Sequence, residues 1–359
     1  MIRFRRLAAC GVALLLTAAC ASGKRVDTAP GSGDDDGAVH LTMFIWAGSH
    51  QGDVPRQVVK QYLASHPGVT IDFVESNNTV TYPKMVAAKR TTPNDNYVDF
   101  GFFNASTLAQ GEVDGMWDPL NPSAIPNMAT VLPAYRTDGD RGVGYQATVF
   151  GLLYNKDKVP APPESWSALW DPAFAGRVTT FDYQWQALTL AARLGGGGEH
   201  NIEPGFRTWS QRANQFKALV SSNDQLKNLL VTGDAWVAPW FSAIARDWIR
   251  EGAPLGFTVP REGGIAFPTY LAVVTNLSPE RKKVAQEVIN LLLDAGNAGR
   301  YGELTGSIPL VRDARFASDD PNQRIEVAER AMRFDWVSIA KNDAAWRQRW
   351  DRDVKSQMR

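Results

Sequence analysis

Apolar stretches of strand length alternate with stretches of helical spacing along the chain from residue 39 onward. Residues 40–47 and 70–75 are short apolar runs, whereas the apolar positions Val54, Val58 and Tyr62 between them recur at helical intervals. These patterns predict a strand, a helix and a second strand. The alternation continues with a helix at 82–90, a strand at 98–103, a short helix after Asn104 and an extended stretch at 144–155.

A second set of elements follows the proline-rich run at 160–163. Ser278 followed by Pro279 predicts the N-cap and first position of a helix that reaches residue 294. Strands alternating with helices predict an α/β fold, here with a sheet in each of two lobes. The remaining expected elements are strands at 177–181, 235–240, 255–260 and 265–275, helices at 182–194, 241–251, 322–333 and 343–355, and two helices between 206 and 231.

The first twenty residues have the layout of a bacterial export signal, with a basic start at 1–6, an apolar stretch at 7–16 and small residues before Cys20. About ten apolar residues are too few to span a hydrocarbon core of ~30 Å, so we expect this segment, residues 1–19, to be removed. The stretch before Cys20 is similar to a lipoprotein signal-peptidase site, although Thr17 stands where such sites prefer leucine. Cys10 fits the short pattern but lacks a preceding apolar region.

We therefore expect lipidation of Cys20, an anchor at the outer face of the cytoplasmic membrane, and a flexible tether over residues 20–38, which are rich in glycine and aspartate. An ordinary secreted protein cut at the small residues is the alternative. About 340 residues then remain, enough for two domains.

Composition excludes several classes of function. The formal net charge is zero, so no nucleic-acid partner is expected. Both cysteines lie in the first twenty residues, which leaves none for a disulfide, a thiolate nucleophile or a metal site in the body of the chain. The four histidines have no paired metal-ligand spacing, and we expect neither a metal nor a cofactor. They are His40, His50, His66 and His200.

Four stretches of the chain resemble a known family. They are residues 150–159 (FGLLYNKDKV), 163–166 with 169–172 (PESW and LWDP), 233–236 with 239–240 (GDAW and PW), and 259–265 (VPREGGI). In order and spacing they resemble the bacterial extracellular solute-binding proteins of ABC importers, in the spermidine/putrescine-binding branch.

The resemblance implies two lobes of a periplasmic-binding-protein fold, joined by crossing strands near 145–150 and 265–270, with an interlobe cleft that closes by a hinge. It assigns residues 39–147 plus 268–312 to the first lobe and 148–267 plus 313–359 to the second. The implied partners are one small ligand and the permease subunits of the importer, and the protein is expected to be a monomer. The sequence has no nucleotide-binding Gly-x4-Gly-Lys loop of its own.

Family members hold a polyamine between stacked aromatic rings, with carboxylates at its ammonium groups. Aromatic faces attract cations by ~0.5–2 kcal/mol, and carboxylates add charge-assisted hydrogen bonds. By resemblance, Trp46, Trp185, Trp240 and Phe267 are the aromatic candidates, and Asp182 matches an amine-binding carboxylate. The other interpretation of Asp182 is an N-cap of the helix that follows it.

Several positions depart from the family pattern. Trp185 and Thr269 stand where the family has two further acids, and Lys341 replaces a polar residue. A desolvated diamine with one counter-charge would leave an ammonium under-paired, so a ligand with a single cationic end is favoured over spermidine. Ser49, Asn104 and Ser106 follow strands and are expected either to contact the ligand at the cleft rim or to cap helices.

Other classes of function are less consistent with these residues. A sugar, an organic anion or a phosphonate is the alternative ligand, because tryptophan faces also stack on sugars and Lys341 favours an anion. A scaffold that no longer binds a small molecule is a further alternative. A secreted hydrolase is the remote one, since the sequence has no convincing carboxylate pair, Gly-x-Ser-x-Gly elbow or metal cluster. We do not expect an enzyme.

Overall fold

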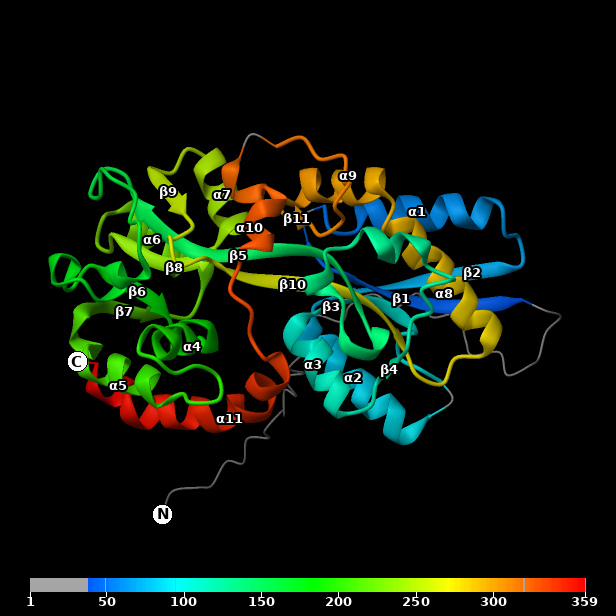
Figure 1. Ribbon diagram of the computed structural model, residues 1–359, viewed down its shortest axis with the longest axis horizontal. Helices are drawn as coiled ribbons and strands as arrows, with labels where there is room; N and C mark the ends of the chain where they lie inside the picture. Colours follow the sequence, from blue (N-terminus) through cyan, green and yellow to red (C-terminus); the bar gives the residue numbers. More distant parts are fainter. Residues whose placement is uncertain (1–37, 49, 94, 319, 359) are drawn as a thin grey trace, which may run out of the picture. The chain divides into compact units, whose positions relative to one another are not determined.

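The computed structural model describes residues 38–48, 50–93, 95–318 and 320–358. The expected signal segment, Cys10, Cys20 and all of the tether except residue 38 lie outside these ranges. No helix within them is both long and apolar enough to cross a membrane. A mixed sheet runs through the described chain in the order β2-β1-β3-β10-β5-β8-β6-β7 (Figure 1).

The first part of the sheet is parallel. Strand β1 (Val39–Trp46) lies between β2 (Val69–Ser76) and β3 (Phe100–Asn104) and pairs in parallel with both. Its residues alternate between two cores. Leu41 and Met43 face helices α1 (Asp53–Ala64), α8 (Pro279–Leu292) and α9 (Ala295–Thr305) in what we call the α1-side core. Phe44 faces α2 (Asn78–Thr91) and α3 (Ala105–Val113) in the α3-side core.

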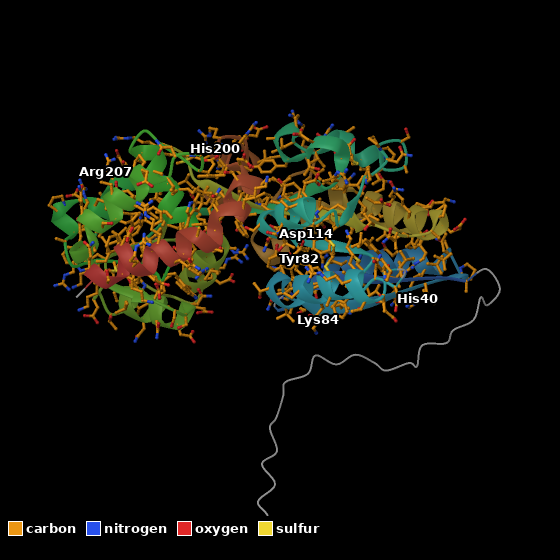
Figure 2. The ribbon with its side chains drawn as sticks, turned by 90° about the horizontal axis from the view of Figure 1, so that it is seen from below. His40, Tyr82, Lys84, Asp114, His200 and Arg207 are labelled. Carbon is orange, nitrogen blue, oxygen red and sulfur yellow. The ribbon has the colours of Figure 1, made fainter. Side chains whose placement is uncertain are left out.

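Helices α2 and α3 are tied together at the surface. The hydroxyl of Tyr82 donates a hydrogen bond to Oδ2 of Asp114 at 2.5 Å, and the two side chains lie side by side in Figure 2. Burial and the neighbouring carboxylate raise the pKa of Tyr82 well above its ordinary value. The pair fixes these two helices under one face of the sheet.

Two long strands pass from one half of the sheet to the other (Figure 1). Strand β5 (Val143–Asn155) pairs antiparallel with β10 (Ile265–Val274), with Phe267 opposite Thr148 and a register shift after Thr269. Along β5, Val149 belongs to the α1-side core, whereas Phe150 belongs to a separate core around Leu188 and Trp209, the α4-side core. The two halves therefore share strands but not a hydrophobic core.

The second half adds further strands on the far side of β5. Strand β8 (Val237–Phe241) is antiparallel to β5, and β6 (Val178–Phe181) and β7 (Phe216–Val220) continue in parallel. Helices α4 (Trp185–Leu194), α5 (Glu203–Gln211) and α11 (Trp336–Asp353) pack on one another over this part. The remaining elements are β4 (Trp117–Asp118), β9 (Leu255–Thr258), β11 (Ile308–Pro309), α6 (Asn223–Val231), α7 (Ser242–Arg250) and α10 (Ile325–Glu329).

Most expected elements are present, but three expected helix boundaries are wrong. The helix expected from residue 182 begins at Trp185. The two helices expected between 206 and 231 are present as α5 and α6, but strand β7 between them was not expected. The helix expected at 322–333 shortens to α10, and the one expected from 343 begins at Trp336, where Asp335 caps it by accepting from Ser338 N. Helix α9 was not expected at all. The Ser278 cap of α8 is confirmed, with its side chain accepting from Arg281 N.

Candidate ligand-binding site

Strand ends from both halves converge on β10. Strand β3 ends at Asn104, which is paired with Thr269 of β10. From the other half, β8 ends at Phe241, which is paired with Phe150 of β5, and Phe150 is in turn paired with Ile265 of β10. The carboxyl ends of strands are where α/β sheets bind ligands, so residues 265–269 mark the floor of a candidate site.

A continuous series of aromatic rings crosses this floor. We call it the aromatic row. Trp240 stacks on Phe181 with ring centroids 4.2 Å apart and nearly parallel planes. The neighbouring ring, Phe241, meets Phe267 edge-on at 5.5 Å. The members of the row, in order of contact, are Phe181, Trp240, Phe241, Phe267, Trp336 and Trp185. The structure thus brings together three of the four aromatic residues named from the sequence.

Trp336, the first residue of α11, joins the row to both halves of the protein. Its ring lies 5.7 Å from that of Phe267 and 4.9 Å from that of Trp185. It also packs against two cores, the α3-side core and the α4-side core, and α11 contacts α3. This side chain therefore contacts groups in both halves of the protein.

A partly buried ion pair fixes the start of α11. The guanidinium of Arg193 makes three hydrogen bonds to Glu199, at 2.8 Å to Oε1 and at 3.0 and 3.2 Å to Oε2, and donates to the carbonyl of Arg333. Oε1 of Glu199 also accepts from the backbone N–H of Asp335 at 2.8 Å. Burial by itself would raise the pKa of Glu199, but these hydrogen bonds outweigh it and lower that pKa below the ordinary value. The pair holds the backbone immediately before Trp336.

Asp182 does not cap the helix that follows it. The N-cap of α4 is Gln184, so the expectation that Asp182 caps this helix is wrong. The physical reason is Tyr183, whose φ of 56° cannot belong to a right-handed helix. The carboxylate of Asp182 accepts a hydrogen bond from Nζ of Lys355 in the C-terminal segment, which raises the pKa of that lysine. Its Oδ1 is buried without a partner in the described part of the chain.

Uncharged polar side chains line β10 next to the aromatic row. Thr269 is 2% exposed, and its hydroxyl accepts from Nε2 of Gln146 at 3.0 Å. The neighbouring Asn104 caps α3 by accepting from Thr107 N at 2.8 Å, and its own N–H donates to Oδ1 of Asn78 at 3.1 Å. The capping role named from the sequence is therefore present at Asn104.

Three further residues named from the sequence take no part in the contacts described above. Trp46 ends β1 and packs against the α1-side core, and its Nε1 is buried without a partner among the described residues. Ser106 is half-buried in the first turn of α3, and Lys341 is exposed on α11. Ser49 lies outside the described residues.

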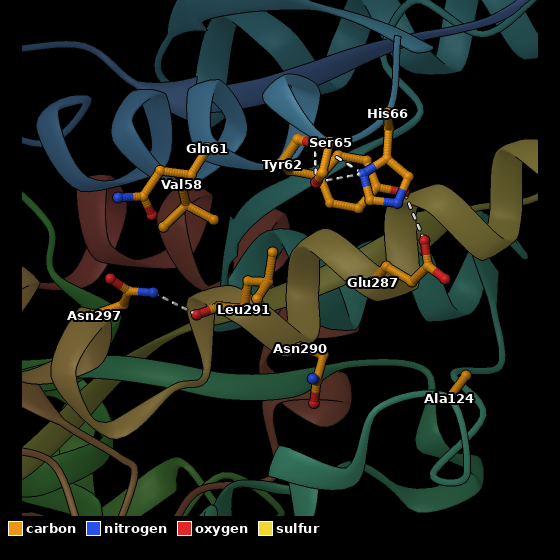
Figure 3. A pocket seen from close by; sticks show the side chains of 10 residues that line it. All are labelled: Val58, Gln61, Tyr62, Ser65, His66, Ala124, Glu287, Asn290, Leu291 and Asn297. Carbon is orange, nitrogen blue, oxygen red and sulfur yellow. Dashed lines mark hydrogen bonds between the residues drawn. The ribbon is translucent and has the colours of Figure 1, made fainter. Parts of the chain in front are cut away.

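A separate hollow of about 470 Å³ lies between α1 and α8 (Figure 3). The hydroxyl of Tyr62 donates to Oε2 of Glu287 there at 2.6 Å, and its ring stacks on His66 at 3.9 Å. None of the residues named from the sequence as ligand contacts lines this hollow.

The histidines do not form a cluster. His40 and His200 lie on different halves in Figure 2. His200 Nε2 is 3.3 Å from Oδ2 of Asp335, at the exposed start of α11. Over the described ranges, no three histidine, cysteine or acidic side chains come close enough to hold a metal ion.

Sequence reasoning missed four residues of the site: Phe181, Phe241, Trp336 and Gln146. Phe241 directly follows Trp240 at a strand end, so its position was a usable signal. Asp335 followed three residues later by Ser338 is a cap pattern that could have located the start of α11, and with it Trp336. Gln146 lies inside a strand, where its sequence context carries no such signal.

Two halves that share crossing strands, with a row of aromatic rings where the strands end, define a two-lobed solute-binding protein. Residues 98–342 match the family described as bacterial extracellular solute-binding protein. The chain belongs to this family.

Individual relatives share between 16% and 24% sequence identity with this chain. The spermidine/putrescine-binding periplasmic protein of Escherichia coli (strain K12) is 24% identical over 268 residues, which cover 70% of this chain and 73% of the relative. A solved ABC transporter structure from Clostridium perfringens has 19% identity and a TM-score of 0.76, covering 88% of this chain and 99% of its own. A spermidine/putrescine ABC transporter substrate-binding protein from Streptococcus pneumoniae has 16% identity and a TM-score of 0.72, covering 90% and 100%. The two structures show the shared fold.

Proposed function

We propose that this protein is the binding component of an ABC importer, anchored at the outer face of the cytoplasmic membrane through a lipid on Cys20. It captures a small amine-containing solute when the two lobes close about β5 and β10, and it delivers that solute to permease subunits. The proposed lobes are residues 39–147 plus 268–312 and residues 148–267 plus 313–359. The protein acts as a monomer and not as an enzyme.

The observation that carries the amine assignment is the aromatic row. Six rings from β6, β8, β10, α4 and α11 follow one another at centroid distances between 4.2 and 5.7 Å. Ring faces attract an ammonium or quaternary ammonium group and bury the alkyl chain attached to it. The names of the Escherichia coli and Streptococcus pneumoniae relatives, which refer to spermidine and putrescine, agree with an amine ligand.

The charges near the row favour one cationic end on the ligand. Asp182 is already hydrogen-bonded to Lys355, and Thr269 contributes a hydroxyl where the related proteins are expected to have an acid. A second ammonium would be desolvated without a carboxylate, which costs several kcal/mol. A monoamine or a quaternary or zwitterionic amine is therefore proposed ahead of a polyamine.

A neutral sugar is the second candidate. Tryptophan rings stack on sugar rings as well as on cations, and the uncharged side chains of Asn104, Gln146 and Thr269 match hydroxyl groups. Lys341 gives weaker support to an organic anion or phosphonate, because it is exposed on α11.

The ligand class is tested by thermal shift of the purified protein with putrescine, spermidine, choline, betaine, maltose and succinate. A ligand at one hundred times its Kd stabilises by about 2.7 kcal/mol, a shift of several degrees. We expect choline or betaine to give that shift, and Phe241→Ala to abolish it. Phe174→Ala is the matched control, since Phe174 contacts Trp236 in the same half and lies outside the row. A shift with maltose alone would reject the amine assignment.

Anchoring is tested separately from binding. We expect the protein to incorporate labelled fatty acid and to stay with the membrane fraction of the producing cells, and Cys20→Ala to lose both properties. Cys10→Ala is the control and should retain them. Release of the Cys20→Ala and unaltered proteins into the medium in equal amounts would contradict the lipid anchor.

A further inference from the structure

Four uncharged polar residues, connected through side-chain and backbone contacts, lie beside the aromatic row, and we call them the polar row. Gln146 Nε2 donates to the hydroxyl of Thr269 at 3.0 Å. Thr269 is paired with Asn104 across β10 and β3, and Asn104 N donates to Oδ1 of Asn78 at 3.1 Å. The polar row thus links β5, β10, β3 and the start of α2.

Each end of the polar row carries an unpaired group. Oε1 of Gln146 and Nδ2 of Asn78 are buried and have no hydrogen-bond partner in the described ranges of the chain. The two residues are 8% and 3% exposed. Buried polar groups in native proteins are almost always paired, and leaving one unpaired costs about 1–3 kcal/mol. One end of the row offers an acceptor and the other end offers donors.

The polar row lies on the same face of the sheet as the aromatic row. Phe267 and Thr269 are two residues apart on β10, before its register shift, so their side chains project from one face about 7 Å apart along the strand. The hydrogen bond from Gln146 to Thr269 places the Gln146 amide on that face too. A ligand a few bonds long can therefore contact both rows.

We propose that the polar row recognises a neutral hydroxyl or amide group at the end of the solute opposite its amine. This inference rests on the proposed function and names the class of ligand more closely. A hydroxyl or amide group can donate as well as accept, so it can donate to the Gln146 carbonyl or accept from the Asn78 amide. An ammonium only donates, and the row contains no carboxylate to balance its charge. A carboxylate only accepts and leaves Oε1 of Gln146 unpaired.

Three amines with the same four-carbon chain test this assignment: n-butylamine, 4-amino-1-butanol and putrescine. They share one ammonium and carry a hydrogen, a hydroxyl or a second ammonium on the carbon at the other end. By titration calorimetry on the purified protein, we expect 4-amino-1-butanol to bind at least about tenfold more tightly than the other two, the equivalent of one hydrogen bond. This comparison needs no variant, so folding does not confound it.

Two substitutions test whether Gln146 causes the preference for 4-amino-1-butanol. Gln146→Glu places a carboxylate at the same site and is expected to move the preference to putrescine. Gln146→Met removes the acceptor and should bring the affinities for 4-amino-1-butanol and n-butylamine to within about twofold of each other. Circular dichroism and the thermal midpoint of each variant report its folding.

The outcomes separate this inference from the proposed function. Equal binding of n-butylamine and 4-amino-1-butanol by the unaltered protein, or tighter binding of putrescine, overturns the role of the polar row while amine binding stands. Binding of none of the three amines overturns the proposed function, and the inference with it.

Discussion

Trp336→Ala is expected to lower the free energy of unfolding by about 3 kcal/mol and to weaken solute binding at least tenfold. Truncating a buried tryptophan typically costs about 3–5 kcal/mol, and the lower figure applies because Trp336 is only partly buried. The effect on binding follows from its contacts. The ring touches Phe267 and Trp185 and packs against cores of both halves, so its loss interrupts the aromatic row and removes a contact between α11 and the α3-side core. Urea denaturation and calorimetry measure the two quantities.

Two variants serve as controls for Trp336→Ala. Trp336→Phe keeps an aromatic ring at the start of α11 and should recover most of the stability and binding. Lys341→Ala changes an exposed side chain on the same helix and should alter the free energy of unfolding by less than about 0.5 kcal/mol. If Trp336→Ala unfolds like the unaltered protein and binds normally, the ring does not connect the two halves.

Much of the fold could be predicted from the sequence, because in segments such as β1 and α8 the local sequence pattern agrees with the observed structure. Strand β1 is a short apolar run between polar segments, and α8 begins with Ser278 and Pro279, whose capping geometry depends only on neighbours in the chain. The missed strand β7 shows where such signals fail. Phe216–Val220 is five residues long, too short for periodicity to distinguish a strand from a turn of helix.

The candidate site could be predicted only in part, because its arrangement depends on contacts between segments that are far apart in the sequence. Trp185, Trp240 and Phe267 could be named from strand and helix ends together with the family resemblance. Their common neighbour Trp336 could not, since its helix was placed too far along the chain. Asp182 stands three residues before Trp185 in sequence, yet the left-handed Tyr183 intervenes and the carboxylate pairs with Lys355 instead. A single backbone angle thus excludes Asp182 from the helix that the sequence predicted it to begin.

The polar row illustrates a second limit. Its members come from four separate elements, and what distinguishes Gln146 is a buried carbonyl oxygen without a partner. That property depends on everything packed around it. No pattern of residue types along a strand encodes it, so it could emerge only from the folded structure.

Arg193→Met is expected to lower the free energy of unfolding at pH 7 by about 3 kcal/mol, because it leaves the carboxylate of Glu199, 8% exposed, without its counter-charge. Methionine keeps an apolar side chain near the ring of Phe334, on which the guanidinium lies at 3.9 Å. The backbone before Trp336 also loses the hydrogen bond from Arg193 to Arg333. We therefore expect weaker solute binding as well as lower stability, measured by calorimetry and by urea denaturation.

The pH dependence of the stability lost in Arg193→Met should identify the cause of that loss. In the unaltered protein the pKa of Glu199 is depressed, so its contribution is present above the ordinary glutamate pKa of about 4.3 and is lost as the pH falls. Without Arg193, burial raises that pKa, and protonation relieves the buried charge. The destabilisation should therefore be largest at pH 7 and shrink below about pH 4. Adding Glu199→Gln should recover part of the stability at pH 7, whereas a destabilisation that stays constant from pH 7 to pH 4 would mean that lost packing, and not the unpaired carboxylate, is responsible.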